Sequence, residues 1–261
     1  MRERFGSDSR QMADFNALII AAGRGMRMGA RGREHPKGFL QIEGRRIIER
    51  SVGMLRAHGV GHIRIVTGHL ADQYEALFAG VGDVECLHNP LYAETGSLRS
   101  MLTGLEGLEG PVVIVESDLV YERRALAPVT PGETVLVISG ETKATDEQFV
   151  WVRDTGGPMP AFEEMSKNRH ARPEPHFGEH TGITGFSAEM AERLRQVARQ
   201  VLSEDPKSEY EPSLVRLAQE ADLPCCLIED LAWAEIDDEA MYERALKTVW
   251  PRIVENDAVS A

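Results

Sequence analysis

Hydrophobic residues follow two different patterns along the chain. Short apolar runs such as "ALIIAA" and "PVVIV" have the length and continuity of strands that are buried on both faces. Between these runs, apolar residues recur every three or four positions, so that Ile47, Val52 and Leu55 fall on one helical face. In the first half of the chain this predicts strands at 17–22, 62–68, 84–89 and 111–118, alternating with helices at 47–59, 71–80 and 97–108.

This alternation of strands and helices predicts an α/β fold. Each strand returns to the sheet through a helix, an order typical of a Rossmann-like, mostly parallel central sheet with helices on both faces. Ser97 is predicted as the N-cap of the third helix. Ligands of such sheets bind beyond the carboxyl ends of the strands, so the loop after the first strand is the expected position of a site.

The pattern changes after about residue 130. Strands are predicted at 134–140, 148–154, 160–166 and 181–187 with little helix between them, followed by helices at 188–203 and 212–221, a strand at 224–230 and a last helix at 238–249. Because no linker or repeat separates the halves, we predict a small β-rich elaboration of one domain rather than a second domain. The predicted domain spans 15–255, with halves at 15–130 and 131–255, after a flexible polar extension at 1–14.

Composition narrows the classes of function. The net charge of −13 argues against a general nucleic-acid binder, so a phosphate-bearing ligand would need locally concentrated cations or metal ions. Three cysteines without a Cys-x-x-Cys pair argue against a zinc cluster or a disulfide framework. The apolar runs are far shorter than the roughly 20 residues that span a bilayer, and the N-terminus has no signal-peptide pattern. These features predict a cytoplasmic protein without membrane partners.

The loop after the first strand, in "ALIIAAGRGMRMGARGREHPKGFL", has three interpretations. A Walker loop is absent, because no Gly-Lys-Ser/Thr follows at the required spacing. A dinucleotide fingerprint would use Gly23, Gly25 and Gly29, but their spacing is one residue too long, although Glu43 lies at the distance of a ribose-binding acid. In the third interpretation the glycines let backbone N–H groups approach a triphosphate, and Arg27 and Lys37 neutralise its charge.

The third interpretation is supported by a resemblance of this stretch to a known family. "AAGRGMRMGARGREHPK" resembles the signature of nucleotidyltransferases with the sugar-nucleotide pyrophosphorylase (GT-A-like) fold: Ala-Ala-Gly-x-Gly-Ser/Thr-Arg, then Pro-Lys. Met26 replaces the usual hydroxyl residue, so the backbone contact to phosphate remains without the side-chain contact. The resemblance covers roughly residues 17–252. It implies nucleotide contacts by Ala22, Gly23, Gly25 and Met26, and by Asn89, Thr95, Gly96 and Ser97 in "NPLYAETGSLRSM".

The resemblance also implies a metal site and an acceptor site. Asp118 in "VVIVESDLVY" and Asp237 in "WAEIDDEAMYERA" match the family's metal-binding aspartates, and Mg²⁺ usually takes one or two carboxylates. Asp238 is better placed to cap the last helix. Lys167 in "PAFEEMSKN" matches a lysine that faces the acceptor's phosphate, and is expected to act in catalysis together with Lys37 and Arg27. The strand "GEHTGITGFS" implies an acceptor pocket lined by Glu179, His180 and Gly182.

Several acceptors remain open. "ESDLVY", "EEMSKN" and "AEIDDEAM" together resemble cytidylyltransferases acting on phosphocholine or 2-aminoethylphosphonate. This implies transfer of CMP from CTP to a small phosphonate or phosphate ester, with Mg²⁺ as cofactor and pyrophosphate as product. The alternatives are phosphocholine or another small phosphorylated acceptor, a sugar 1-phosphate, and a non-catalytic nucleotide-sensing subunit; a homodimer also stays open.

The acceptor's head group is expected to be small. A cationic head group needs carboxylates or aromatic faces around it. Trp151, Tyr121, Tyr210 and Glu179 are available residues of these types. A quaternary ammonium should demand more aromatic surface than a primary amine, and only 6% of the residues are aromatic.

Overall fold

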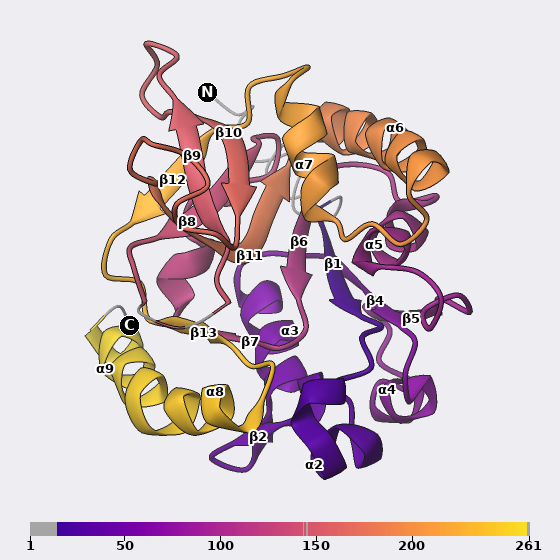
Figure 1. Ribbon diagram of the computed structural model, residues 1–261. Coiled ribbons are helices and arrows are strands. Elements are labelled where there is room, and N and C mark those ends of the chain that lie inside the picture. Colours follow the sequence, from indigo (N-terminus) through magenta and orange to yellow (C-terminus); the bar gives the residue numbers. More distant parts are fainter. Residues whose placement is uncertain (1–14, 143, 145, 260–261) are drawn as a thin grey trace, which may run out of the picture.

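The computed structural model describes residues 15–142, 144 and 146–259, and the extension predicted for residues 1–14 lies outside them (Figure 1). The first half of the chain builds four parallel strands in the order β6-β1-β4-β5. Their bounds are β1 (Asn16–Ala21), β4 (His62–Thr67), β5 (Val84–His88) and β6 (Val112–Glu116). The central strand β1 pairs with β4 on one side and β6 on the other, so its main-chain groups are buried within the sheet.

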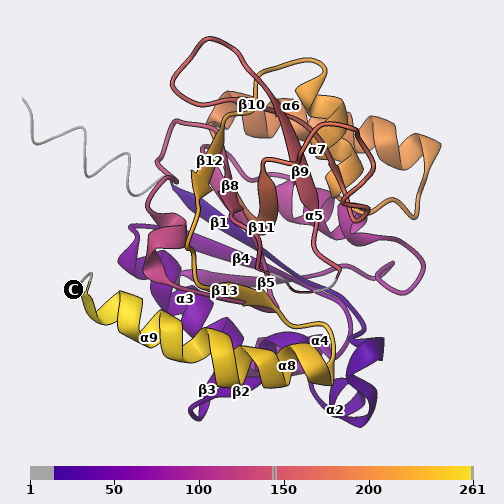
Figure 2. The ribbon, with the colours of Figure 1, turned by 60° about the vertical axis from the view of Figure 1, so that its left-hand side comes forward.

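Helices cover both faces of this sheet, because successive side chains of a strand point to opposite sides. Leu18 of β1 packs with α5 (Ser97–Leu105), α6 (Ala188–Glu204) and α7 (Glu211–Ala218). Its neighbours Ala17 and Ile19 pack against the other face, with α3 (Ile47–Ala57) and α4 (Ala71–Leu77). Figure 2 shows the two helical layers on either side of the strands. The predicted α/β class is confirmed.

The second half extends the same sheet with mainly antiparallel strands. The long strand β11 (Gly178–Phe186) pairs antiparallel with β6, with β8 (Val135–Ser139) and, at its first two residues, with β9 (Phe149–Arg153). β10 (Ala161–Ser166) adds to β9, and β12 (Cys225–Ile228) runs parallel to β8. This is the predicted β-rich elaboration. The boundary proposed between the two halves stays a prediction.

A two-stranded sheet brings the end of the chain next to the end of β6. β7 (Leu119–Tyr121) pairs antiparallel with β13 (Trp233–Glu235), so residues near 118 and near 236 become neighbours. The backbone N–H of Ile236 donates to the carbonyl of Asp118 at 3.1 Å. A short pairing therefore joins two segments that are more than a hundred residues apart in sequence.

The last helix is longer than predicted. Its first part, α8 (Glu239–Arg244), continues through a π-helical turn at Ala245–Val249 into α9 (Trp250–Val259). Pro251 does not end the helix, because it lies in the first turn of α9, where its missing N–H costs little. The prediction that the helix ends near residue 249 is therefore wrong.

Short elements fill the loop after β1 and the remaining connections. They are η1 (Met26–Met28), α2 (Gly29–Glu34), η2 (Lys37–Phe39), β2 (Gln41–Ile42), β3 (Arg45–Arg46) and η3 (Arg123–Leu126). Within the described residues, every helix falls short of the length or the apolar character that crossing a bilayer requires.

Candidate active site

A cavity of about 750 Å³ lies beyond the carboxyl ends of the strands. Gly23 after β1, Asp118 after β6, Lys167 after β10 and Asp237 after β13 all line it. Four segments that are distant in sequence therefore contribute to one pocket at the edge where parallel sheets bind their ligands.

The glycine loop is shaped by close backbone packing. Gly25 has a φ of +59°, the left-handed region that favours glycine. A Cβ added at Gly32 would lie 2.3 Å from the carbonyl oxygen of Gly25, so α2 packs directly on the loop. Ala22 is buried at the end of β1, and Gly23 faces the cavity. Met26 is 70% exposed, and like Ala22 and Gly25 it is not among the residues that line the cavity.

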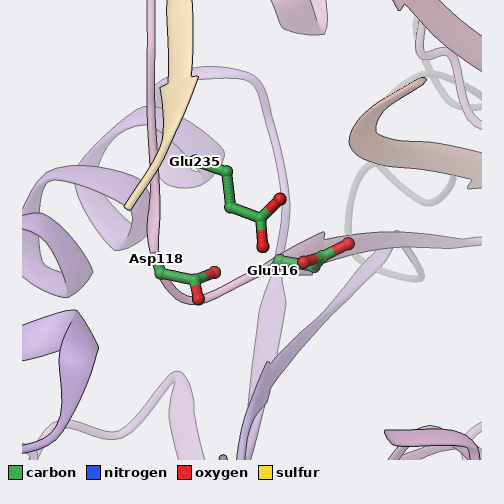
Figure 3. A group of neighbouring side chains, drawn as sticks. All are labelled: Glu116, Asp118 and Glu235. Carbon is green, nitrogen blue, oxygen red and sulfur yellow. The ribbon is translucent and has the colours of Figure 1, made fainter. Parts of the chain in front are cut away.

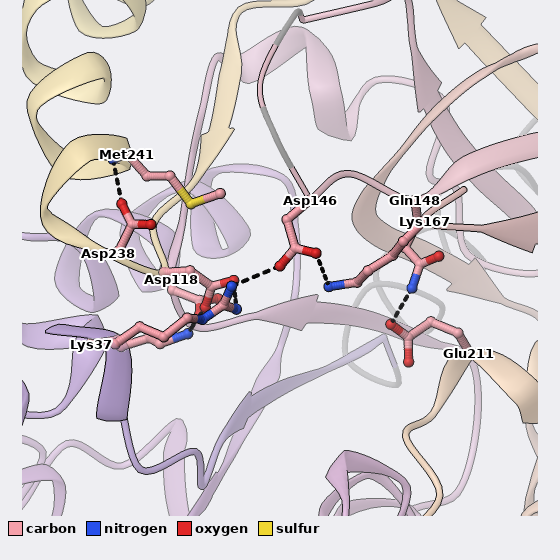
Figure 4. Close-up of polar contacts among 10 residues, drawn as sticks. Lys37, Asp118, Asp146, Gln148, Lys167, Glu211, Asp238 and Met241 are labelled. Carbon is pink, nitrogen blue, oxygen red and sulfur yellow. Dashed lines mark hydrogen bonds and ion pairs between the residues drawn. The ribbon is translucent and has the colours of Figure 1, made fainter. Parts of the chain in front are cut away.

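The predicted cations and aspartates form one continuous network of ion pairs (Figure 4). The Lys37 Nζ donates to Asp118 at 2.7 Å and also contacts Asp237. Arg27 pairs with Asp237 and, at 2.7 Å, with Asp146. The other oxygen of Asp146 is 2.9 Å from the Nζ of Lys167. The structure thus brings together Arg27, Lys37, Lys167, Asp118 and Asp237.

The network holds its members in their charged forms. Burial lowers the pKa of Lys37, but the carboxylates of Asp118 and Asp237 outweigh burial and raise the pKa well above its usual value. Burial likewise raises the pKa of Asp237, but Lys37 and Arg27 outweigh it, and the pKa lies below its ordinary value. The cavity therefore has fixed charges of both signs at neutral pH.

Two further carboxylates, missed in the sequence, lie beside Asp118 (Figure 3). Oxygens of Glu116, Asp118 and Glu235 lie within 4.8 Å of one another. Burial, followed by repulsion from Asp118 among other carboxylates, raises the pKa of both glutamates. Three hard oxygen donors this close suit a divalent cation such as Mg²⁺. Asp237 lies outside this group.

A strand pattern could have revealed these glutamates. Glu116 precedes Asp118 by two residues, as Glu235 precedes Asp237, and residues two apart in a strand share a face. Asp238 was correctly predicted as a cap, because its Oδ1 accepts a hydrogen bond from the backbone N–H of Met241 at 2.8 Å, at the start of α8.

Only one of four predicted nucleotide contacts near α5 reaches the cavity. Ser97 lines it, but the N-cap of α5 is Gly96, so the prediction of Ser97 as the cap is wrong by one residue. The Ser97 hydroxyl instead accepts from the backbone N–H of Tyr210 at 3.0 Å, and its own N–H donates to Glu209 at 2.8 Å. A Cβ at Gly96 would lie 2.2 Å from the carbonyl oxygen of Ser208, which explains why glycine fits there.

Asn89 and Thr95 have local structural contacts instead. The buried amide of Asn89 donates to the Ser100 hydroxyl at 3.0 Å, and its Oδ1 accepts from the backbone N–H of Leu91 at 3.0 Å. The Thr95 hydroxyl donates to the carbonyl of Leu91 at 2.8 Å. Neither residue lines the cavity, so the structure does not bring them to the candidate site.

Three of the predicted acceptor residues line a smaller recess of about 40 Å³, namely Lys167, His180 and Gly182. Burial lowers the pKa of His180 to about 4, so its imidazole is neutral at physiological pH. Glu179 lies outside both the cavity and the recess, and its Oε2 accepts from the backbone N–H of Thr142 at 2.9 Å. Of the candidate aromatic residues, only Tyr210 lines the site, since Trp151 and Tyr121 are buried elsewhere in the core.

Similar folds define the class of protein. The solved structure of CTP:phosphocholine cytidylyltransferase from Streptococcus pneumoniae superposes with a TM-score of 0.75 at 19% sequence identity, covering 89% of this chain and 98% of that one. The fold is therefore that of the nucleotidyltransferases. The family follows from the sequence: residues 17–203 match the MobA-like NTP transferase domain, and the chain belongs to this family of nucleotidyltransferases.

Two curated relatives are similar over parts of the chain. The 2-aminoethylphosphonate cytidylyltransferase of Lancefieldella rimae is 28% identical over 183 residues, which is 69% of this chain and 70% of that protein. The CMP-5'-(3-aminopropyl)phosphonate synthase of Streptomyces rubellomurinus is 33% identical over 113 residues, 42% of this chain. That match spans only 18% of the Streptomyces protein.

Proposed function

We propose that the chain transfers CMP from CTP to a small phosphonate such as 2-aminoethylphosphonate and releases pyrophosphate. The observation that carries this proposal is the convergence of three cationic side chains and a carboxylate cluster on one cavity. The names of the two curated relatives support a phosphonate as the acceptor.

The proposed reaction joins two anions. A phosphonate oxygen of the acceptor attacks the α-phosphorus of CTP, a new P–O bond forms, and the bond to the bridging oxygen of pyrophosphate breaks. The attacking oxygen is already ionised, so the step needs no general base. His180 therefore has no role in proton transfer in this proposal. Alignment of the two substrates and neutralisation of their charge then supply most of the catalysis.

Each cation has a proposed partner. Lys37 and Arg27 come from the segment after β1, where they can neutralise the triphosphate next to the glycine loop. Lys167 enters from β10 and is proposed to contact the acceptor's phosphonate. Without substrates, all three are paired with carboxylates of the network. We propose that the incoming anions take over these pairings.

Magnesium is the proposed cofactor. The resemblance assigns Asp118 and Asp237 as ligands, and the close oxygens of Glu116, Asp118 and Glu235 fit a hard divalent cation. When bound, Mg²⁺ would neutralise charge on the phosphate oxygens and on the leaving pyrophosphate. Lys37 contacts both Asp118 and Asp237, so the lysine and the cofactor would together neutralise the charge of these two aspartates.

A panel of nucleotides and acceptors tests the proposal. Pyrophosphate release should be measured with each NTP against 2-aminoethylphosphonate, phosphocholine and hexose 1-phosphates. We expect the highest rate with CTP and 2-aminoethylphosphonate. Turnover only with a hexose 1-phosphate would contradict the assigned acceptor, and no turnover with any pair would favour a nucleotide-sensing role.

A further inference from the structure

The recess next to the main cavity has many more carboxyl groups than cationic groups on its walls. It shares Glu116, Gln148, Lys167, Glu211 and other wall residues with the cavity, so a molecule bound there can extend into it. Among the described residues, its walls carry five carboxylates and a single ammonium group. The five carboxylates belong to Glu116, Asp146, Glu147, Glu211 and Glu235, and the ammonium group to Lys167.

The single ammonium group does not balance these carboxylates. Lys167 pairs with Asp146 at 2.9 Å, and none of the four glutamates forms a salt bridge within the described part of the chain. Arg244 and Lys37 act on them only beyond salt-bridge distance: Arg244 lowers the pKa of Glu147, and Lys37 lowers that of Glu116, each against the larger effect of burial. Glu116 accepts only from the neutral Tyr210 hydroxyl, at 2.5 Å. One oxygen of Glu211 accepts from the Gln148 amide at 3.2 Å, and the other is buried without a hydrogen-bond partner (Figure 4).

Glu147 is the clearest case of an unpaired group. Glu147 is only 4% exposed and lines the recess. Its side chain forms no hydrogen bond or ion pair with any described residue. Burial, followed by repulsion from Glu179, raises its pKa to about 8. Burying a carboxylate is costly unless a partner compensates for the lost water. Within the described residues, no positively charged donor of the recess reaches Glu147, because the Lys167 ammonium group is paired with Asp146.

We propose that the recess binds the primary ammonium group of the acceptor, with Glu147 and Glu211 as its main partners. This inference rests on the proposed cytidylyl transfer, whose acceptor would place its phosphonate near Lys167 at the common wall of cavity and recess. The short alkyl chain of the acceptor then extends from Lys167 into the recess and places the amine beside the glutamates. His180 is neutral and adds no opposing charge.

The chemistry of the recess selects a primary amine over a quaternary one. The unpaired glutamate oxygens need N–H donors, and a primary ammonium group offers three whereas a trimethylammonium group offers none. The recess of about 40 Å³ also accommodates the smaller group more readily. Tyr210 is the one aromatic side chain on its walls within the described residues, which is less than an aromatic cage requires.

The test compares acceptors that differ only at the amine. For the wild-type protein, kcat/KM with 2-aminoethylphosphonate should exceed that with ethylphosphonate by at least about tenfold, since an acceptor without the amine leaves buried polar groups unpaired. Glu147→Gln and Glu211→Gln should each lower kcat/KM for the amino acceptor about tenfold or more. Each should lower kcat/KM less with ethylphosphonate than with 2-aminoethylphosphonate, so that the preference for the amino acceptor falls.

Glu163→Gln provides the matched control. Glu163 lies on β10, pairs with Arg172 at 3.0 Å and lines neither space, so its variant should keep the wild-type preference. Thermal melting verifies that each variant is folded, and the wild-type comparison needs no variant. Equal use of ethylphosphonate or phosphocholine, or an unchanged preference in both glutamine variants, would overturn the recess assignment while leaving cytidylyl transfer intact. No transfer to any acceptor would overturn both proposals.

Discussion

Lys37 joins Asp118 to Asp237 in the ion-pair network. Its ammonium group contacts both aspartates assigned to the metal, and its stem packs against the glycine loop, since a Cβ at Gly25 would lie 3.4 Å from Lys37 Cγ. A side chain held in this way is already placed for incoming phosphates. Catalysis by charge neutralisation depends on such groups being fixed before the reaction begins.

We therefore predict that Lys37→Ala and Asp118→Ala each lower turnover at least about a hundredfold, the typical effect of losing a major electrostatic contact. Initial rates of pyrophosphate release at saturating CTP and acceptor measure this. Lys247→Ala is the control, because Lys247 is an exposed lysine that pairs with Glu243 on the last helix. Near-normal rates in either site variant would remove that residue from the mechanism.

Glu147 allows a prediction about stability that is independent of activity. Its pKa is raised to about 8 in the folded protein from an ordinary value of 4.5, so the folded state holds the proton more tightly than the unfolded state does. The stability gained from this protonation is complete at low pH and is lost as pH rises from about 5 to 8. The loss should be on the order of a few kcal/mol.

Urea unfolding at pH 5 and at pH 8.5 measures this effect. The free energy of unfolding should fall with pH less steeply in Glu147→Gln than in the wild-type protein, and Glu163→Gln should keep the wild-type dependence. Identical pH dependence in the Glu147→Gln and wild-type proteins would show that Glu147 does not titrate as its burial implies.

At the scale of elements, the sequence determined much of the site because its residues follow buried strands. Asp118 and Asp237 each come directly after an apolar segment, and β-pairing between β7 and β13 brings the two together. Periodicity also predicts the buried face of α3, where Ile47, Val52 and Leu55 are all buried. The length of the last helix was not predicted correctly. Apolar residues such as Ile253 continue its buried face beyond the predicted end at residue 249.

A loop contributes two of the site residues that the sequence did not reveal. Asp146 and Glu147 lie between β8 and β9 in "ETKATDEQ", a polar stretch without a period that could assign side chains to a pocket. Asp146 also has a φ of +76°, a conformation that its residue type does not predict. Conversely, Asn89 and Glu179 do not line the cavity, because polar residues near a site often stabilise a turn or a loop instead, as both do here.

The contact between α2 and the glycine loop yields a prediction at the same scale. Gly32→Ala should lower the free energy of unfolding by about 1–3 kcal/mol, because the new methyl group would meet the Gly25 carbonyl at 2.3 Å and force the backbones apart. Gly23→Ala is the matched control, since a Cβ there has no neighbour within 4 Å and its φ is not positive. Urea unfolding compares the two, and equal stability would show that α2 can shift without cost.

At the scale of the whole molecule, both the chain and its candidate site have more acidic than basic residues. The net charge is −13, and among the described residues the main cavity is lined by seven carboxylates and three cationic side chains. A nucleoside triphosphate is itself strongly anionic. A bound divalent cation would reduce this repulsion, and the close oxygens of Glu116, Asp118 and Glu235 offer a position for one.

CTP binding should therefore depend on the divalent cation. Calorimetric titration with CTP is expected to give an affinity at least about tenfold lower in EDTA than in Mg²⁺, a difference of about 1.4 kcal/mol. The loss should be smaller in Asp118→Asn, because this variant removes one of the carboxylates that repel the nucleotide and hold the ion. Equal affinity with and without Mg²⁺ would instead favour the nucleotide-sensing alternative, since Arg27, Lys37 and Lys167 would then suffice to hold the triphosphate against seven carboxylates.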